Sequence, residues 1–83
     1  MRFSRFLVLD ALVREDRLLR GWELADIVGV RCTGSASVMI TEMVRCGVIY
    51  RPYAGTYGLT ERGRVAHALQ SAINTRAARR GYQ

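Results

Sequence analysis

Two cysteines and one histidine are the side chains of this sequence best suited to metal binding or to nucleophilic chemistry. Thirteen residues separate Cys32 from Cys46, and His67 is the single imidazole. A tetrahedral zinc site needs four ligands, and zinc-binding cysteines usually come in C-x-x-C pairs, which this sequence lacks. We therefore expect no metal ion and no cofactor.

The surroundings of His67 give no indication of catalysis. The sequence places no serine, cysteine or carboxylate at a spacing that would orient or activate this imidazole, and it has no glycine-rich phosphate-binding loop. We expect a binding protein rather than an enzyme, without a small-molecule ligand. The segment that starts at Met1 lacks the features of a secretory signal, and the chain has two cysteines. Both observations favour a cytoplasmic protein with reduced cysteines. The spacing of the two cysteines does not exclude a disulfide. No apolar run approaches the roughly 18 residues of a membrane span.

Arginine is the other chemically distinctive residue type. All 13 basic residues are arginines, and with 7 carboxylates they give a net charge of +6. Residues 1–30 are neutral, whereas residues 31–60 and 61–83 carry the positive excess. A basic surface attracts polyanions, because each arginine near a phosphate releases condensed counterions. Since a chain without lysine also fits a coding bias toward GC-rich codons, the positions of the arginines matter more than their number.

The hydrophobic periodicity predicts four helices around a short hairpin, in a chain long enough for one domain. Apolar residues recur at helical spacing in segments 3–13, 22–28, 35–46 and the residues after Thr60. Residues 18–21 form a short extended piece before the second helix. The β-prone runs 48–53 and 56–59 flank Ala54-Gly55, which is typical of a hairpin with glycine at the turn.

Several positions predict how these elements end and pack. Gly29 and Gly47 are placed to end the second and third helices, and Thr60 to cap the fourth. Pro52 cannot donate to a ladder, so it belongs on an edge or at a bulge. Trp22 is expected to pack against the first helix. The third helix should turn its apolar side inward, a set that comprises Ala36, Ile40, Met43 and Val44 with Met39 beside them.

The order of these elements resembles the winged helix-turn-helix family. Three motifs carry the resemblance: Leu24-Ala25 ahead of Gly29-Val30, Gly47-Val48-Ile49, and Tyr57-x-Leu59-Thr60-x-x-Gly63. It covers about residues 5–75. It implies a mainly α fold with a small β-hairpin wing, in a domain over residues 1–75 followed by a basic tail over residues 76–83.

This resemblance implies a small transcriptional regulator that binds double-stranded DNA. The third helix, about residues 35–46, would enter the major groove, and the wing, about residues 48–59, would contact the backbone or the minor groove. Candidate contact residues carried over by position are Arg31, Thr33, Ser35, Ser37, Val38, Thr41, Arg45, Arg51, Tyr53 and Thr56. Serine and threonine discriminate little between bases, and Val38 can touch a thymine methyl group, so Arg31 and Arg51 are the strongest candidates.

Other functions of such a domain stay open. It can serve as a protein-interaction module, or as an accessory factor that binds nucleic acid with little sequence preference. We expect a homodimer through the C-terminal helix, the first helix or both, because two-fold pairing sets two recognition helices ~34 Å apart. The apolar stripe of the last helix can pack either on the first helix or on a second copy, and it consists of Val65, Ala66, Leu69, Ala72 and Ile73.

Overall fold

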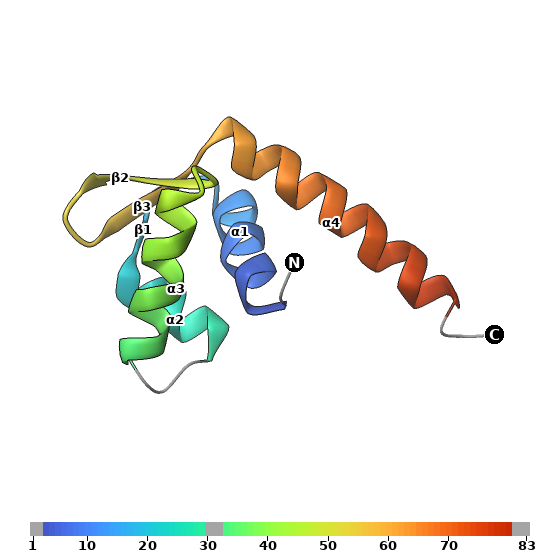
Figure 1. Cartoon of the computed structure of the whole chain (residues 1–83), viewed down its shortest axis with the longest axis horizontal. Coiled ribbons are helices and arrows are strands. Elements are labelled where there is room, and N and C mark those ends of the chain that lie inside the picture. The colour runs from blue at the N-terminus through green and yellow to red at the C-terminus, as the bar shows by residue number, and fades with distance from the viewer. Residues whose placement is uncertain (1–2, 30–32, 81–83) are drawn as a thin grey trace.

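The computed structural model describes residues 3–29 and 33–80, and the side chains of residues 4–29 and 37–77. Its elements, in chain order, are α1 (Phe3–Glu15), β1 (Leu19–Arg20), α2 (Gly21–Val28), α3 (Thr33–Arg45), β2 (Ile49–Tyr53), β3 (Thr56–Leu59) and α4 (Glu61–Arg80). Figure 1 shows α1, α2 and α3 gathered beside a small sheet, with α4 running away from them. This mainly helical layout with a small sheet confirms the predicted winged helix-turn-helix fold class.

A three-stranded antiparallel sheet in the order β1-β3-β2 forms the wing and its base. Arg20 of β1 pairs with Thr56, and Ile49 of β2 pairs with Leu59. The register of β2 shifts between Tyr50 and Tyr53, so Pro52 sits at an irregularity of an edge strand, as predicted. The short extended piece before α2 is therefore a third strand, which extends the hairpin.

The core lies between the first three helices and the base of the wing. Its fully buried side chains come from α1, β1, α2, α3 and β2, and the largest are Val8, Leu9, Leu19, Leu24, Met43 and Ile49. On α3 the predicted inward set is confirmed where side chains are described, since Ile40 and Met43 are buried and Val44 packs against them. Residues 35 and 36 lie outside the described side chains.

The prediction for Trp22 is wrong, because its side chain is 69% exposed. The apolar face of α2 is anchored by the buried Leu24. Trp22 comes two residues earlier, which places it ~200° around the helix and on the solvent side.

The last helix begins where predicted. Thr60 precedes the first residue of α4, and the backbone N–H of Gly63 donates to Thr60 Oγ1 at 3.0 Å, which is a helix cap. Gly63 has no room for a side chain, because a Cβ there would overlap the carbonyl oxygen of Val48. The helix does not break at residue 75 but continues to Arg80, so the basic residues 76–80 extend α4.

None of the helices described within residues 3–29 and 33–80 is both long and apolar enough to cross a membrane.

Candidate nucleic-acid interface

The outer face of α3 carries short, exposed side chains. Ser37, Val38, Thr41 and Arg45 are exposed, on the side of the helix opposite the buried Ile40 and Met43. Helical geometry explains this split, because positions three and four apart share a face. The predicted outer face is therefore confirmed for the described part of α3.

A hollow of about 160 Å³ lies between α3 and the wing. Thr41 and Arg45 line it from α3, and Arg51 lines it from β2. Val44 and Tyr57, both half-buried and packed against the core, also line it. Three of the residues predicted from sequence, Thr41, Arg45 and Arg51, thus line one concave surface. Two of them carry guanidinium groups.

The pattern of ion pairs leaves positive charge on this surface. Carboxylates pair with arginines of α1, of the connector after it and of the first turn of α4, in the pairs Arg5–Glu42, Arg14–Asp10 at 2.9 Å, Arg17–Glu23 at 2.8 Å and Arg64–Asp16 at 3.7 Å. Within residues 3–29 and 33–80, no carboxylate pairs with Arg20, Arg45 or Arg51. The same holds for Arg62 and Arg76 on α4. A phosphate near α3 and the wing would therefore meet arginines without a carboxylate partner.

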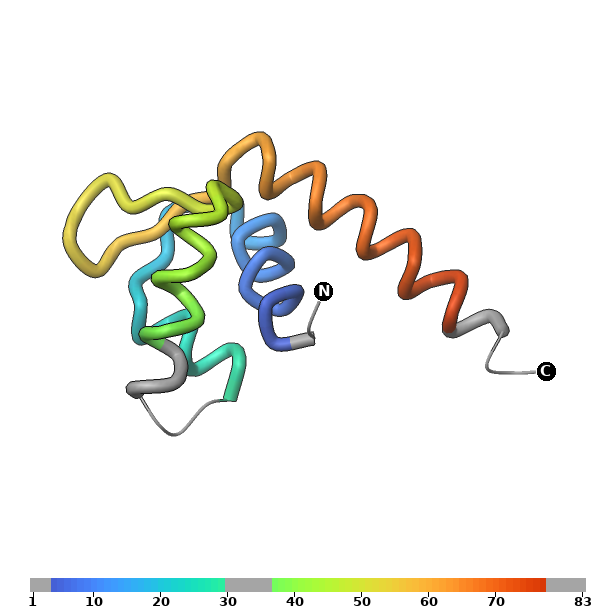
Figure 2. Tube along the Cα trace, viewed as in Figure 1, coloured from blue at the N-terminus to red at the C-terminus, as the bar shows by residue number. Residues whose placement is uncertain are grey.

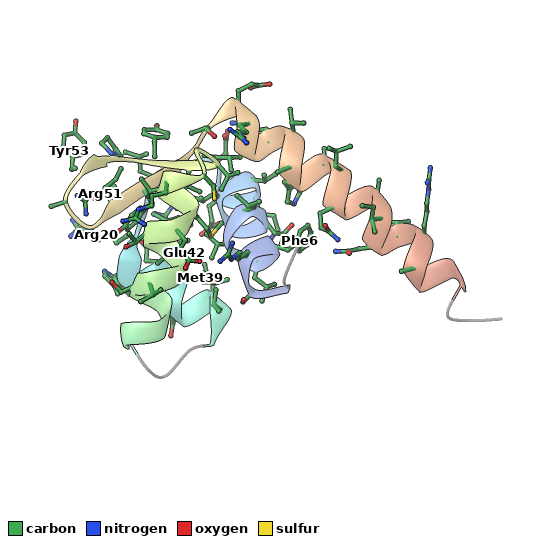
Figure 3. All side chains as sticks on the ribbon, in the orientation of Figure 1. Phe6, Arg20, Met39, Glu42, Arg51 and Tyr53 are labelled. Atoms are coloured by element: carbon green, nitrogen blue, oxygen red, sulfur yellow. The ribbon has the colours of Figure 1, made fainter. Side chains whose placement is uncertain are left out.

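Glu42 is the one acidic residue in the sequence of α3. It follows Thr41 on the helix but pairs with Arg5 of α1, on the flank away from the hollow. The pair neutralises the negative charge that would otherwise oppose an anion at α3. Figure 3 labels Glu42 beside the ribbon of α3 and Arg51 at the wing.

The hydroxyl group of Thr41 has a defined role within the helix. Thr41 Oγ1 donates to the carbonyl oxygen of Ser37 at 2.8 Å. Its donor is thereby used, while the oxygen keeps accepting capacity. Thr41 is suited to accept a hydrogen bond from an amino group, such as those of adenine or cytosine in the major groove.

The wing exposes one further candidate. Tyr53 is 70% exposed, and its partner across the ladder is Thr56, which is half-buried. Tyr50 belongs to a different surface, because its ring packs on Gly58 so closely that a Cβ there would lie 2.6 Å from its Cε1. Of the two tyrosines of β2, Tyr53 is the more exposed.

Arg20 is a candidate that the sequence analysis missed. It ends β1 and is exposed, while its neighbour Leu19 is fully buried. Arg20 and Arg51 lie on the two outer strands of one small sheet, with β3 between them, and Figure 3 shows both at the wing end of the molecule. The alternation of Leu19 inward and Arg20 outward was the available signal.

Arg20 lies at the junction between β1 and α2, where its charged neighbours are Arg17 and Glu23. Glu23 accepts a hydrogen bond from Arg17 at 2.8 Å and another from the backbone N–H of Arg20 at 3.1 Å. The Arg17 hydrogen bond, and after it the Arg20 N–H, lowers the pKa of Glu23 below its ordinary value. The hydrogen bond to Glu23 likewise raises the pKa of Arg17. Gly21 at the start of α2 is also tied to the wing turn, by a 3.0 Å hydrogen bond to the carbonyl oxygen of Gly55.

The described side chains do not include three of the predicted contact residues. Arg31 lies outside the described residues. Thr33 and Ser35 lie in the first turn of α3, but their side chains are outside the described set. The described candidate residues are therefore Arg20, Ser37, Val38, Thr41, Arg45, Arg51, Tyr53 and Thr56, which we call the α3–wing surface.

His67 lies on a different face of the molecule. Its Nε2 is 3.0 Å from Asp10 Oδ1, and its ring stacks on Phe6 with centroids 5.1 Å apart. The expectation that no carboxylate orients His67 is wrong, because Asp10 comes from α1, 57 residues away in the chain. The contact fastens α4 to α1. Among the described residues, no three histidine, cysteine or acidic side chains are grouped as a metal site would need.

Comparison with known proteins gives no relative. No protein-family model matches the chain, and no curated protein and no solved structure matches it either.

Proposed function

We propose that the chain binds double-stranded DNA as a small transcriptional regulator, with α3 in the major groove and the wing on the adjacent backbone. The observation that carries this proposal is the hollow in which Arg45 of α3 and Arg51 of β2 meet without a described carboxylate partner. Regulation is the role that the winged helix-turn-helix layout suggests for such a binder.

The shape of α3 supports a duplex ligand. The major groove is about 12 Å wide and admits one helix. Short side chains at Ser37, Val38 and Thr41 let the helix backbone approach the base edges closely. The arginines stand at the end of α3 and on the wing, where the phosphates on either side of a groove would lie. We assign base contacts to Val38 and Thr41, and phosphate contacts to Arg45 and Arg51.

The wing and β1 supply the remaining contacts. Arg20 adds a third guanidinium to the same end of the sheet, and Tyr53 extends from the wing. Contacts of this kind fix the position of the protein on the duplex but carry little sequence information. Sequence preference would therefore depend on α3, and affinity mainly on the arginines.

The deciding experiment is a titration of labelled duplex DNA at several salt concentrations. The double variant Arg45→Ala/Arg51→Ala should bind more weakly, and its plot of log affinity against log salt should be shallower by about 2, one for each lost phosphate contact. The matched control is Arg62→Ala/Arg76→Ala, which removes the same charge from α4. Equal losses in both variants would mean that net charge alone drives binding, and would remove the α3–wing surface from the proposal.

Two further arms separate this function from its alternatives. Competition with unrelated duplexes tests sequence preference, because specific sites usually exceed nonspecific ones by about 10³ or more. Equal competition would favour a nonspecific accessory factor. Absence of duplex binding at low salt, together with co-purification of a stable partner, would favour a protein-interaction module.

A further inference from the structure

The middle of α4 exposes an apolar stripe to solvent. Val65, Leu69 and Ile73 are 52%, 63% and 55% exposed. They follow each other at intervals of four residues, so they form one continuous ridge along the helix. In Figures 1 and 2 this helix runs outward from the rest of the chain. Of the stripe predicted from sequence, Ala66 packs against the core, whereas Val65, Leu69, Ala72 and Ile73 stay exposed.

A different side of α4 provides the contact with α1. Gly63 is buried, and Ala66 and His67 are half-buried, with Ala66 packed against the core and His67 paired with Asp10. Gly63 and His67 face away from Leu69 by about a third of a turn or more, and Ala66 lies at the border between the two sides. The apolar side chains of α1 are already used, because Val8, Leu9 and Leu12 are fully or almost fully buried. Among the described helices, α4 is therefore the one with a free apolar ridge.

The ridge also lies in a segment without formal charge. Between Arg64 and Arg76, α4 contains no lysine, arginine, aspartate or glutamate, although 24% of the chain is charged. The surface of a solvated helix normally carries charged residues opposite its packed face. Asn74, Thr75 and the β-branched Ile73 are also weak helix formers, so packing would add to the stability of this part of α4.

We propose that a second copy of this chain covers the ridge, with the two α4 helices antiparallel and a two-fold axis at Leu69. The spacing of the ridge suggests this axis, because Val65 and Ile73 are each four residues from Leu69. A two-fold axis there sets Leu69 against the partner's Leu69, and Val65 against the partner's Ile73. Such an interface is self-complementary, as two-fold symmetry requires.

The neighbouring residues suit helix packing. Ala68 and Ala72 form the adjacent row on α4, and both are exposed. Their small side chains leave a shallow groove beside the ridge, which can receive the ridge of the partner. Two chains that each carry a charge of +6 can make this contact without burying an unpaired charge. An acidic partner would leave the uncharged segment unexplained.

The size of the ridge sets the strength of the association. Three half-exposed aliphatic side chains and two alanines amount to a few hundred Å² of apolar surface. A stable interface buries about 800 Å² on each partner. The dimer therefore dissociates on dilution when DNA is absent. This inference does not rest on the proposed DNA binding, since it concerns another surface and is tested without DNA.

Sedimentation equilibrium over a range of protein concentrations tests the association. The wild-type chain should shift from the mass of one chain to twice that mass as concentration rises. Leu69→Glu should abolish the shift, whereas Thr75→Glu, which adds the same charge about 120° around α4, should leave it intact. Circular dichroism checks that both variants keep their helix content. A monomeric wild type at every concentration, or a dimer that survives Leu69→Glu, would overturn the proposal.

Cysteine cross-linking tests the antiparallel geometry. In a Cys32→Ser/Cys46→Ser background, Leu69→Cys should form a disulfide-linked dimer under mild oxidation, because its two copies meet at the axis. Chains with Val65→Cys should cross-link to chains with Ile73→Cys in a mixture, and much less to themselves. Predominant self-linkage of each variant would indicate parallel helices and would contradict the proposed axis.

Discussion

The hydroxyl group of Thr60 donates a hydrogen bond to the carbonyl oxygen of Gly47 across 2.6 Å. Thr60 Oγ1 also accepts a hydrogen bond from the backbone N–H of Gly63 at 3.0 Å. One partly buried side chain therefore joins the end of α3 to the first turn of α4. These two hydrogen bonds fix the direction of α4 relative to the end of α3.

Loss of this hydroxyl group should destabilise the fold. Thr60→Val keeps the shape of the side chain but removes both hydrogen bonds, and we expect a loss of about 1–2 kcal/mol in the free energy of unfolding. Thr60→Ser keeps the hydroxyl group and should lose much less. Urea denaturation measures both. Equal stability of the valine and serine variants would show that the hydrogen bonds contribute nothing.

A methyl group at Gly63 should be tolerated poorly. Its Cβ would overlap the carbonyl oxygen of Val48, a backbone atom that cannot move without shifting the start of the wing. We expect Gly63→Ala to cost about 1–3 kcal/mol, the usual range for overpacking. Gly21→Ala is the matched control, because its nearest neighbour would lie at an ordinary 3.5 Å. Thermal denaturation compares the two, and similar melting temperatures would contradict the close approach at Gly63.

The stability contributed by Glu23 should depend on pH. Its pKa is lowered in the folded chain, mainly by the Arg17 hydrogen bond. This contribution is therefore complete above the ordinary glutamate pKa of about 4.3 and is lost as pH falls through the lower folded-state value. Wild type should exceed Glu23→Gln in melting temperature at neutral pH, and the difference should vanish in acid.

Glu15→Gln provides the comparison for Glu23. Glu15 meets the same arginine at a longer distance of 3.5 Å and accepts no hydrogen bond from Arg20. Its replacement should change the melting temperature less at neutral pH. A difference between wild type and Glu23→Gln that persists unchanged in acid would show that a cause other than the carboxylate charge stabilises this junction.

Arg20 should contribute affinity without sequence preference. We expect Arg20→Ala to weaken binding to all duplexes by a similar factor and to reduce the salt slope by about 1. The control is Arg14→Ala, because Arg14 is already paired with Asp10 at 2.9 Å on α1. Fluorescence anisotropy with labelled duplexes gives both quantities. A loss confined to one sequence would make Arg20 a base-reading residue instead.

Val38 should detect a thymine methyl group. In a duplex chosen by selection from random sequences, replacing the contacted thymine by uracil removes that methyl group and should weaken wild-type binding by about 0.8 kcal/mol, the value of one buried methylene. The same replacement should have little effect on Val38→Ala, because the contact is already gone. If the loss from uracil and the loss from Val38→Ala add up at every thymine of the site, the assigned contact is excluded.

The sequence predicted the parts of the fold that depend on neighbours along the chain. The periodicity of α3, the cap at Thr60 and the irregularity at Pro52 are all local, and each was confirmed. The error at Trp22 was also local, since Leu24 alone fixes the buried side of such a short helix. The length of a helix decides how securely its inner face can be assigned, and α2 is only 8 residues long.

Contacts between distant segments could not be predicted in this way. The pairing of His67 with Asp10 joins α1 to α4, and no spacing in the sequence encodes it. Arg20 was missed for a similar reason, because its place beside the wing follows from the pairing of β1 with β3. The hollow lined by Arg45 and Arg51 combines both cases, since each residue was a candidate but their meeting depends on tertiary structure.

The irregular stretch of β2 affects how this protein behaves in concentrated solution. β2 is one of the two edge strands of the sheet, and an unprotected edge can recruit strands from other molecules into fibrils. Pro52 offers no N–H to such a strand, and the charge of Arg51 beside it repels another copy. We therefore expect strand addition at this edge to be disfavoured when the protein is concentrated.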